Sequence, residues 1–300
     1  FRSMQSNQIA LAFSQYGVPK LAVAIIMTIL VALVMIGGIK RLGKVAEKLV
    51  PTMILIYFTF AVVIIIMNIK VVPEVFMMIF RHAFTPSAAA GGFVGAMVKQ
   101  AMQYGFSRGL LSNEAGLGSA PIAHASAQTP SCIHQGLIGV MEVFIDTIVV
   151  CTLTALVNMV TGAWISGNSG TAMTSLAFST GLPIPNAGGI FIAVCSLLFG
   201  YTTIIGWGFY GEQCLKYLFG LKIVYPYRVV YIGLTFVGAI ISIDLVFAIG
   251  DIANAIMALP NLLALVLLSG TVASITRQFY KKYHSIKNFN PETDVFQPEL

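Results

Sequence analysis

The chain has 300 residues, of which 57% are hydrophobic and only 9% are charged, and its formal net charge is +6. Soluble globular domains contain about 25% charged residues, so this composition excludes an ordinary soluble protein and predicts one that is dissolved in a lipid bilayer. The basic residues lie mainly between apolar segments and after the last of them, so the positive charge indicates no nucleic-acid partner.

Long apolar runs predict a helical protein that crosses the membrane several times, because a membrane-spanning helix needs about 20 mainly apolar residues. The runs are Leu21–Ile39, Leu49–Met67, Gly136–Val160, Ile190–Gly211, Val229–Ile243 and Leu245–Leu268. Phe106–Ala127 adds a broken span, and Phe1–Phe13 resembles the end of a further helix, as expected of a piece of a longer protein. We therefore expect an all-α polytopic membrane protein with about eight crossings.

The distribution of Lys and Arg predicts which ends of the spans face the cytoplasm, because short cytoplasmic connections are enriched in basic residues. Counting crossings places three basic clusters on one side: Lys40, Arg41, Lys44 and Lys48; Lys216, Lys222 and Arg228; and Arg277, Lys281, Lys282 and Lys287. The connection Thr161–Gly189 has no charged residue and falls on the opposite side. The C-terminus is therefore predicted to be cytoplasmic.

Two segments outside the spans differ in character from the rest. Residues 68–105 are only partly apolar and are predicted to form an external loop with interfacial helices, among them a short amphipathic helix at Ala96–Tyr104. Residues 270–300 are predicted to form a cytoplasmic tail. The tail is polar from His284 onward, so we expect that part to be disordered.

The most informative stretch is the polar segment inside Phe106–Ala127. Its Asn, Glu, Gly and Ser residues loosen a helix and free backbone N–H and C=O groups, which is tolerated at membrane depth only where the chain is buried in protein or lines a watery cavity. Transporters use such breaks to hold substrates and ions. We predict a helix break whose exposed backbone is supplied by Asn113, Ala115, Gly116, Gly118 and Ser119.

Two carboxylates within the predicted spans are candidates for an ion path. An ionised side chain at mid-membrane costs roughly 2.5–3.5 kcal/mol on insertion scales, so it faces a cavity or a partner. Glu114 is expected to cap the half-helix that follows it, to line a cation path, or to do both. Asp146 is expected to be structural and paired with a hydroxyl or with a basic group such as Arg108, with a place in the ion path as the alternative.

Thr202 and Thr203 interrupt the run Ile190–Gly211. The simplest interpretation is that their hydroxyls bond to carbonyls one turn earlier, as in many membrane helices. The alternative is a sodium site, because Na⁺ is a hard cation that binds oxygen ligands. Trp207 lies between two glycines and either packs as an interface anchor or forms one wall of a substrate pocket.

The sequence indicates neither an enzyme nor a metal centre. His124 and His134 have no clustered Cys or acid at ligand spacing, and no nucleophile has a plausible base nearby. The motifs of serine hydrolases, zinc proteases and phosphate-binding loops are absent from the sequence. We therefore expect no catalytic residue.

The segment Arg108–Ala127, RGLLSNEAGLGSAPIAHASA, resembles the signature of the alanine/glycine:cation symporter family. Further similarity lies at Ile145–Thr147 (IDT), Gly206–Glu212 (GWGFYGE) and Gly250–Leu265 (GDIANAIMALPNLLAL). The resemblance extends over nearly the whole chain. It implies a protein of the inner (plasma) membrane that couples Na⁺ entry to uptake of alanine or glycine by alternating access.

The family is similar in fold to the leucine-transporter superfamily, which has two inverted five-helix repeats that cross at broken helices. On this resemblance, residues 1–67 are the remainder of the first repeat, from the end of its third helix through its fourth and fifth. Residues 68–105 are the external loop, 106–269 are the second repeat with its broken helix, and 270–300 are the cytoplasmic tail. The first helices of repeat one are missing.

The resemblance also implies roles for single residues. Thr202 and Thr203 fall where the superfamily places a sodium site, and Gln5, Trp207 and the broken stretch Asn113–Ser119 fall near the amino acid. The missing helices are expected to supply much of the substrate and sodium shell, so this piece is not expected to transport by itself.

Two rival functions stay open. A proton-driven carrier would use Glu114 or Asp146 as the proton carrier, and its uptake would follow pH instead of sodium. A non-transporting membrane scaffold would tolerate the substitutions Gly116→Leu and Thr203→Ala without loss of function.

Overall fold

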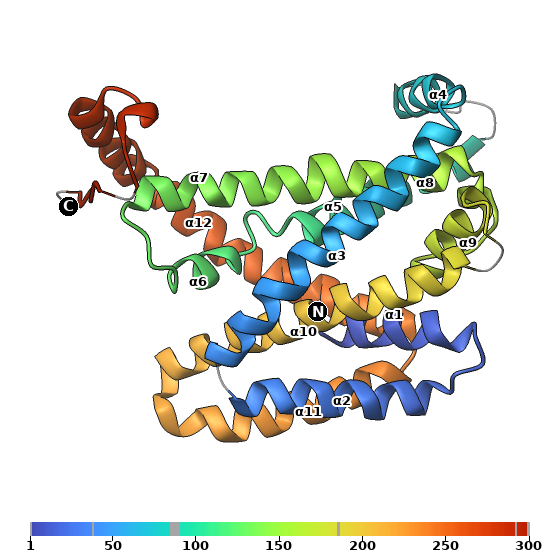
Figure 1. Cartoon of the computed structure of the whole chain (residues 1–300), viewed down its shortest axis with the longest axis horizontal. Helices are drawn as coiled ribbons and strands as arrows, with labels where there is room; N and C mark the ends of the chain where they lie inside the picture. The colour runs from blue at the N-terminus through green and yellow to red at the C-terminus, as the bar shows by residue number, and fades with distance from the viewer. Residues whose placement is uncertain (1, 38, 85–90, 185–186, 292, 299–300) are drawn as a thin grey trace. The chain divides into compact units, whose positions relative to one another are not determined.

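A computed structural model describes residues 2–37, 39–84, 91–184, 187–291 and 293–298 of the chain. Within these ranges the secondary structure is helical except for one isolated β-bridge (Figure 1). The helices are α1 (Arg2–Ser14), α2 (Lys20–Gly37), α3 (Ile39–Met67), α4 (Val72–Phe84), α5 (Gly91–Asn113), α6 (Ala120–His124), α7 (Cys132–Val143), a π-helical segment (Phe144–Cys151), α8 (Thr152–Val160), α9 (Thr171–Gly181), α10 (Ala187–Phe219), α11 (Val224–Ile240) and α12 (Ile243–Tyr283). Short 3₁₀ turns lie at Ala163–Ile165, Leu221–Ile223 and Ile286–Asn288.

Six helical stretches of the described chain are long and apolar enough to cross a membrane: Lys20–Gly37, Glu47–Met67, Cys132–Val160, Ala187–Phe219, Leu221–Ile240 and Leu245–Tyr283. They correspond to the six apolar runs of the sequence and confirm an all-α polytopic membrane protein. The other two expected crossings are the 13-residue helix α1, which is shorter than a span, and the broken segment.

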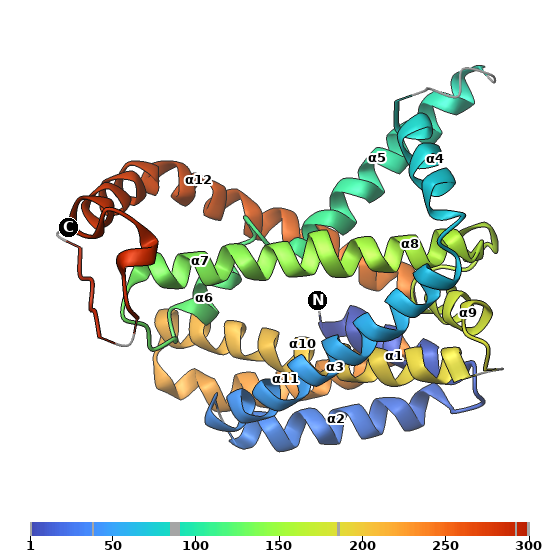
Figure 2. The same ribbon diagram turned by 45° about the horizontal axis from the view of Figure 1, so that its top comes forward.

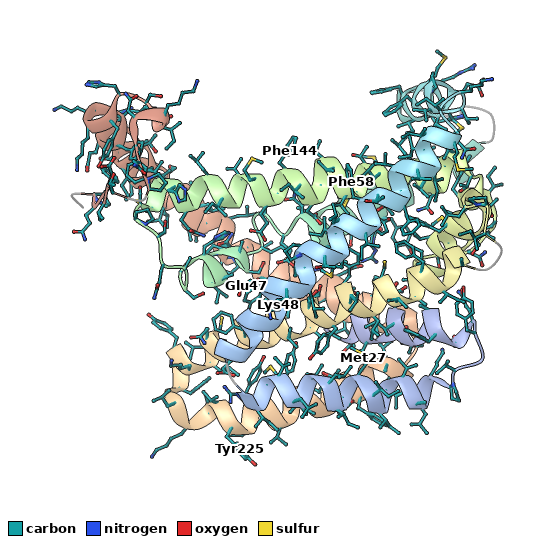
Figure 3. The ribbon with its side chains drawn as sticks, in the orientation of Figure 1. Met27, Glu47, Lys48, Phe58, Phe144 and Tyr225 are labelled. Atoms are coloured by element: carbon teal, nitrogen blue, oxygen red, sulfur yellow. The ribbon has the colours of Figure 1, made fainter. Side chains whose placement is uncertain are left out.

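Apolar side chains remain exposed along these spans, as expected of a surface that faces lipid. Figure 3 labels Phe58 on α3 and Phe144 in the π-helical segment, whose exposed fractions are 40% and 49%, and also Met27 on α2, which is fully buried. Water would penalise such exposed rings at roughly 25 cal/mol per Å² of apolar surface, whereas a bilayer does not.

Contacts divide the chain into two units, which we describe separately. The first unit comprises residues 1–100 and 150–250, and the second comprises residues 101–149 and 251–300.

Helix α10 is the central helix of the first unit. It packs against α1, α2, α3, α9 and α11 (Figures 1 and 2). One apolar cluster joins α10 to α1, α2 and α11 through buried residues such as Ile9, Met27 and Ile204. A second joins α10 to α3, α4, α8 and α9 through residues such as Phe178 and Ile192. Because one helix contributes to both clusters, its position is fixed on two sides.

The structure defines three helix boundaries more closely than the sequence does. The apolar run Ile190–Gly211, in which Thr202 and Thr203 are the polar interruption, lies within the single helix α10, which passes through both residues without a break. The expected short helix Ala96–Tyr104 is part of α5, which is continuous from Gly91 to Asn113. The connection Thr161–Gly189 contains the helix α9, whose buried Phe178 contributes to the second cluster.

The C-terminal segment of the second unit is ordered where the structure describes it, so the expectation of disorder from His284 onward is wrong for those residues. Phe279 at the end of α12 is buried together with Phe289 and Phe296. The backbone N–H of Phe296 donates to the carbonyl oxygen of Pro130 at 2.9 Å. Two phenylalanines in a polar sequence are enough to fix the segment, because each buries a large ring area.

The contact between α9 and α10 gives a prediction about stability. Gly188 is buried on α10, and a Cβ atom there would collide with the backbone carbonyl of Phe178. We expect Gly188→Ala to lower the free energy of unfolding by about 1–3 kcal/mol, the usual cost of overpacking.

Thermal unfolding followed by size-exclusion chromatography measures this effect. Gly206→Ala on the same helix is the matched control, because a Cβ atom there meets nothing within 4 Å and alanine favours a helix. Equal melting temperatures for the two variants would contradict the α9–α10 packing.

Candidate functional site

The predicted helix break is present in the second unit. Helix α5 ends at Asn113 and α6 begins at Ala120, and the chain between them forms turns (Figures 1 and 2). Glu114, Gly116 and Gly118 have positive φ angles of 56°, 88° and 87°. Glycine adopts this conformation without strain, whereas Glu114 is an uncommon case for a residue with a Cβ atom. A strained backbone of this kind is frequent at ligand sites.

Local hydrogen bonds shape the turn between the two helices. The side-chain oxygen of Asn113 accepts a hydrogen bond from the backbone N–H of Ala115 at 3.2 Å, so an Asx turn replaces the next helical bond. The hydroxyl of Ser119 donates to the carboxylate of Glu114 at 2.7 Å. Pro121 lies in the first turn of α6, where its missing N–H costs nothing.

Gly118 also allows a close approach between the broken segment and α12. A Cβ atom at Gly118 would lie 3.1 Å from the side-chain oxygen of Asn261. Asn261 follows Pro260, which lies inside α12. Gly116 and Gly118 therefore both allow the turn, and Gly118 also allows the packing against α12.

A polar network joins the end of α5 to the π-helical segment. Ser112 donates its hydroxyl proton to the carboxylate of Asp146 at 2.9 Å, and Thr147 does so at 3.3 Å. The side-chain amide of Asn113 donates to the hydroxyl of Thr147 at 2.6 Å. Asp146 therefore has hydroxyl partners, one of the two kinds expected for it. The wider turn of a π-helix often marks a functional region.

Arg108 is paired with Asp251 on α12. Its guanidinium donates to both carboxylate oxygens, at 2.8 and 3.1 Å, and Ser107 adds a third hydrogen bond at 2.8 Å. Each side chain of the pair is about one third exposed (33% and 35%). A bidentate, charge-assisted contact of this kind fixes orientation as well as distance. It anchors the first arm of the broken helix to α12.

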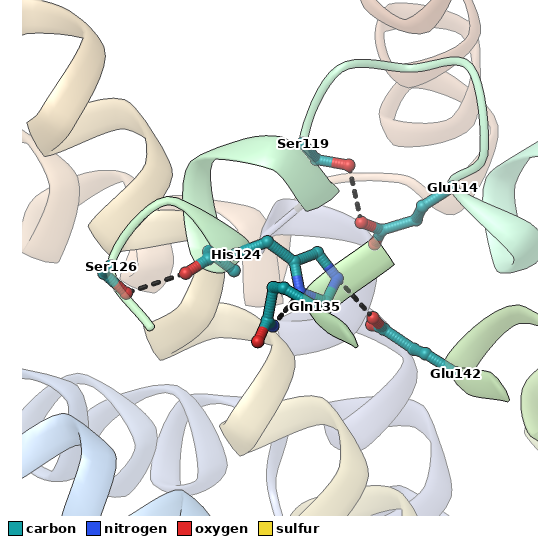
Figure 4. Close-up of polar contacts among 7 residues, drawn as sticks. Glu114, Ser119, His124, Ser126, Gln135 and Glu142 are labelled. Atoms are coloured by element: carbon teal, nitrogen blue, oxygen red, sulfur yellow. Dashed lines mark hydrogen bonds and ion pairs between the residues drawn. The ribbon is translucent and has the colours of Figure 1, made fainter. Parts of the chain in front are cut away.

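The second arm, α6, is attached to α7 by a contact that the sequence analysis missed (Figure 4). The Nε2 atom of His124 lies 3.1 Å from a carboxylate oxygen of Glu142, and its Nδ1 atom lies 2.6 Å from the side-chain nitrogen of Gln135. Gln135, Gly139 and Glu142 are spaced four and three residues apart, which places them on one face of a helix. That spacing was the available signal, but it does not identify the partner.

The first unit contains the remaining predicted site residues. The hydroxyl of Thr202 donates to the carbonyls of Leu198 and Phe199, and that of Thr203 donates to Phe199 at 2.9 Å. This is the simpler of the two interpretations considered for them. Their oxygen lone pairs are compatible in type with a hard cation.

Gln5 and Trp207 also lie in the first unit. The side-chain oxygen of Gln5 would lie 3.5 Å from a Cβ atom at Gly200, so Gln5 on α1 is close to α10 one turn before Thr203. The ring of Trp207 makes an edge contact with Tyr210 at 5.7 Å between centroids. Gln5 is thus close to α10 at Gly200, and Thr203 and Trp207 lie on α10 itself, whereas the broken segment belongs to the other unit.

Comparisons with known proteins agree with these features. The family model described as the sodium:alanine symporter family matches residues 1–294. The chain is 40% identical over 281 residues to the sodium/alanine symporter AgcS of Methanococcus maripaludis, covering 92% of this chain and 60% of that protein.

Two further relatives have names that mention other substrates or ions. The probable sodium/glutamine symporter GlnT of Bacillus subtilis is 35% identical, covering 94% of this chain and 58% of that protein. The sodium/proton-dependent alanine carrier protein of Bacillus sp. (strain PS3) is 32% identical, covering 88% of this chain and 63% of that protein. The chain thus spans about three fifths of the length of these relatives.

The pair Arg108–Asp251 gives a prediction for a double-mutant cycle. We expect Arg108→Ala and Asp251→Ala each to lower the thermal stability, because each leaves a partly buried charge without its partner. The double variant should lose less than the sum, with a coupling of about 1–2 kcal/mol.

Arg277→Ala is the matched control, because Arg277 lies on the same helix with an exposed side chain. It should change the melting temperature little and show no coupling to Asp251→Ala. If the losses of stability in Arg108→Ala and Asp251→Ala add up in the double variant, the two side chains do not stabilise the attachment of α5 to α12.

Proposed function

The chain belongs to the sodium:alanine symporter family, and we propose that its complete gene product couples Na⁺ entry to the uptake of alanine or glycine by alternating access. The family consists of transporters and not of enzymes. The chain spans only about three fifths of its relatives, so the proposal concerns the complete gene product.

The break between α5 and α6 is the observation that carries the proposal. A zwitterionic amino acid presents a carboxylate, which needs N–H donors, and an ammonium group, which needs C=O acceptors. Backbone without regular helical bonding at membrane depth can present both kinds of group near the midplane. The proposed contacts to the amino acid come from Asn113, Ala115, Gly116 and Gly118, in the segment where positive φ angles turn the backbone.

Residues of the first unit have proposed roles of their own, which the family resemblance implies. Thr202 and Thr203 are proposed ligands of Na⁺, because their hydroxyl protons are directed to α10 carbonyls and their lone pairs suit a hard cation. Gln5 is a proposed contact to the amino acid. Trp207 is a proposed wall that limits side-chain size.

The proposal that Trp207 limits the size of the substrate side chain matters because family membership alone does not fix the substrate. One relative is named as a sodium/glutamine symporter and others as alanine carriers. An indole ring beside the amino acid would favour alanine or glycine over glutamine, because an extra chain of methylene and amide groups must then displace a well-packed ring.

A proton-coupled carrier is the second candidate, because one relative is named as sodium/proton-dependent. Glu114 or Asp146 would then carry the proton, and both carboxylates accept hydrogen bonds beside the break. A non-transporting scaffold would not need a segment with positive φ angles, because it would bind no ligand there.

We also propose the inverted-repeat arrangement, with residues 1–67 and 106–269 belonging to different repeats. The C-terminus is proposed to face the cytoplasm of a cell whose inner membrane holds the protein. The clustering of Lys and Arg supports this orientation.

Uptake of radiolabelled alanine into proteoliposomes that contain the complete gene product tests the coupling ion. We expect an inward Na⁺ gradient to drive accumulation severalfold above a choline gradient at the same pH, because Na⁺ binding completes the site. Accumulation driven equally well by a proton gradient without Na⁺ would support the proton-coupled carrier instead. No uptake of any amino acid under either gradient would support the scaffold.

Substitution of Thr203 tests the sodium ligands. We expect Thr203→Ala to raise the Na⁺ concentration for half-maximal uptake about tenfold to a hundredfold, since one charge-assisted contact is worth roughly 1.5–3 kcal/mol. Thr203→Ser keeps the hydroxyl and should stay near the wild-type value.

Thr28→Ala is the matched control for this experiment. Thr28 on α2 also donates its hydroxyl proton to a carbonyl one turn earlier, at 2.7 Å, but it is no proposed ligand. If Thr203→Ala and Thr28→Ala have the same small effect on sodium dependence, Thr203 is only a back-bonded helix residue.

A further inference from the structure

Helix α6, the second arm of the broken helix, is short and is held at both ends. It has only five residues, so it has little stability of its own. At its start, Ser119 donates to Glu114 at 2.7 Å. At its end, His124 contacts α7 (Figure 4). The position of this arm therefore depends on the contact that His124 makes.

The contact consists of an imidazole ring between an amide and a carboxylate. Nδ1 of His124 is 2.6 Å from the side-chain nitrogen of Gln135, and Nε2 is 3.1 Å from a carboxylate oxygen of Glu142. Gly139 lies between these two residues on α7, and a Cβ atom there would be 3.3 Å from Nε2. The absence of a side chain at Gly139 lets the ring approach the helix.

This arrangement accepts two protonation states of the ring. In the neutral state, Nδ1 accepts from the amide of Gln135 and the N–H at Nε2 donates to Glu142. In the protonated state, both nitrogens donate, so the amide of Gln135 turns to present its oxygen, and the contact with Glu142 becomes an ion pair. Imidazole is the side chain that gains and loses a proton between about pH 5 and pH 8.

We propose that His124, Gln135 and Glu142 form a proton-binding clamp that sets how firmly α6 is held on α7. A proton on His124 tightens the clamp, because the attraction between two opposite charges is added to the hydrogen bond that the neutral ring already donates to the carboxylate. The side chain of Glu142 is 62% exposed and that of His124 is 24% exposed, so the protein covers the ring more than the carboxylate.

The clamp has a consequence for transport, which rests on the proposed function. If the second arm moves during alternating access, a tighter clamp slows turnover at low pH. Other titratable or charged groups on these elements are Cys132 and His134 on α7, Glu114 in the broken segment, and Asp251, Arg277, Lys281 and Lys282 on α12. Glu114 accepts a bond from Ser119 and Asp251 is paired with Arg108.

Hydrogen–deuterium exchange of residues 119–127 in the purified complete gene product tests the clamp directly. After correction for intrinsic rates, we expect exchange to be about twofold to fivefold slower near pH 5.5 than near pH 8, the range that an exposed ion pair supplies. His124→Gln should abolish this difference, because glutamine does not titrate. His82→Gln, at an exposed histidine on α4, is the matched control and should keep it.

Gln135→Glu tests the clamp by a shift of its pH dependence, so the result does not rest on a variant that is merely less stable. A second carboxylate beside the ring favours imidazolium, so the midpoint of the pH dependence should move to higher pH. The same shift is expected in the pH profile of alanine uptake at saturating Na⁺, which keeps competition between protons and Na⁺ out of the measurement.

Each outcome decides a separate point. Equal pH dependence of exchange in His124→Gln and wild type overturns the clamp, whatever the transport result. The expected exchange results without any amino-acid uptake keep the clamp and contradict the proposed function. If the exchange results are as expected but Gln135→Glu does not shift the pH profile of uptake, the clamp exists and does not control transport.

Discussion

Backbone hydrogen bonding in lipid is the constraint on which this structure depends. A membrane helix can be broken only if other groups support the freed backbone, and the residues around the break supply that support. Asn113 replaces a helical bond with an Asx turn, Ser119 is bonded to Glu114, and Gly118 allows Asn261 of α12 to come close. Removing these partners would leave backbone and side-chain polar groups of the break without hydrogen bonds, which costs free energy wherever water cannot replace the partner.

The two units satisfy their constraints by different means. The first unit is held by apolar burial on two sides of α10, supplemented by hydroxyl-to-carbonyl bonds such as that of Tyr231 to Ile204 at 2.5 Å. The second unit is held at the break by polar pairs between few atoms. Apolar packing resists change over a broad area, whereas single polar contacts can be exchanged one at a time.

Sequence reasoning was most successful where one physical signal dominated. Hydropathy located all six long spans, because lipid imposes both their length and their composition. The break was predicted because Gly116 and Gly118 stand among polar residues. The tail was mispredicted because composition averages over a segment, while Phe289 and Phe296 act as individual anchors. The contact of His124 with Glu142 was missed because residues on different helices meet through tertiary packing, which spacing along one helix does not reveal.

The two arms of the broken helix differ in the kind of attachment they have. Arg108 and Asp251 hold the first arm through two parallel hydrogen bonds, and the guanidinium keeps its charge at any physiological pH. The second arm is held through a single ring, that of His124, by one contact to Glu142 and one to Gln135. The first arm thus has a fixed ionic attachment to α12, and the second has a smaller attachment to α7. For the alternating access proposed above, this difference favours α6 over α5 as the arm that moves, because fewer polar contacts must be exchanged to displace it.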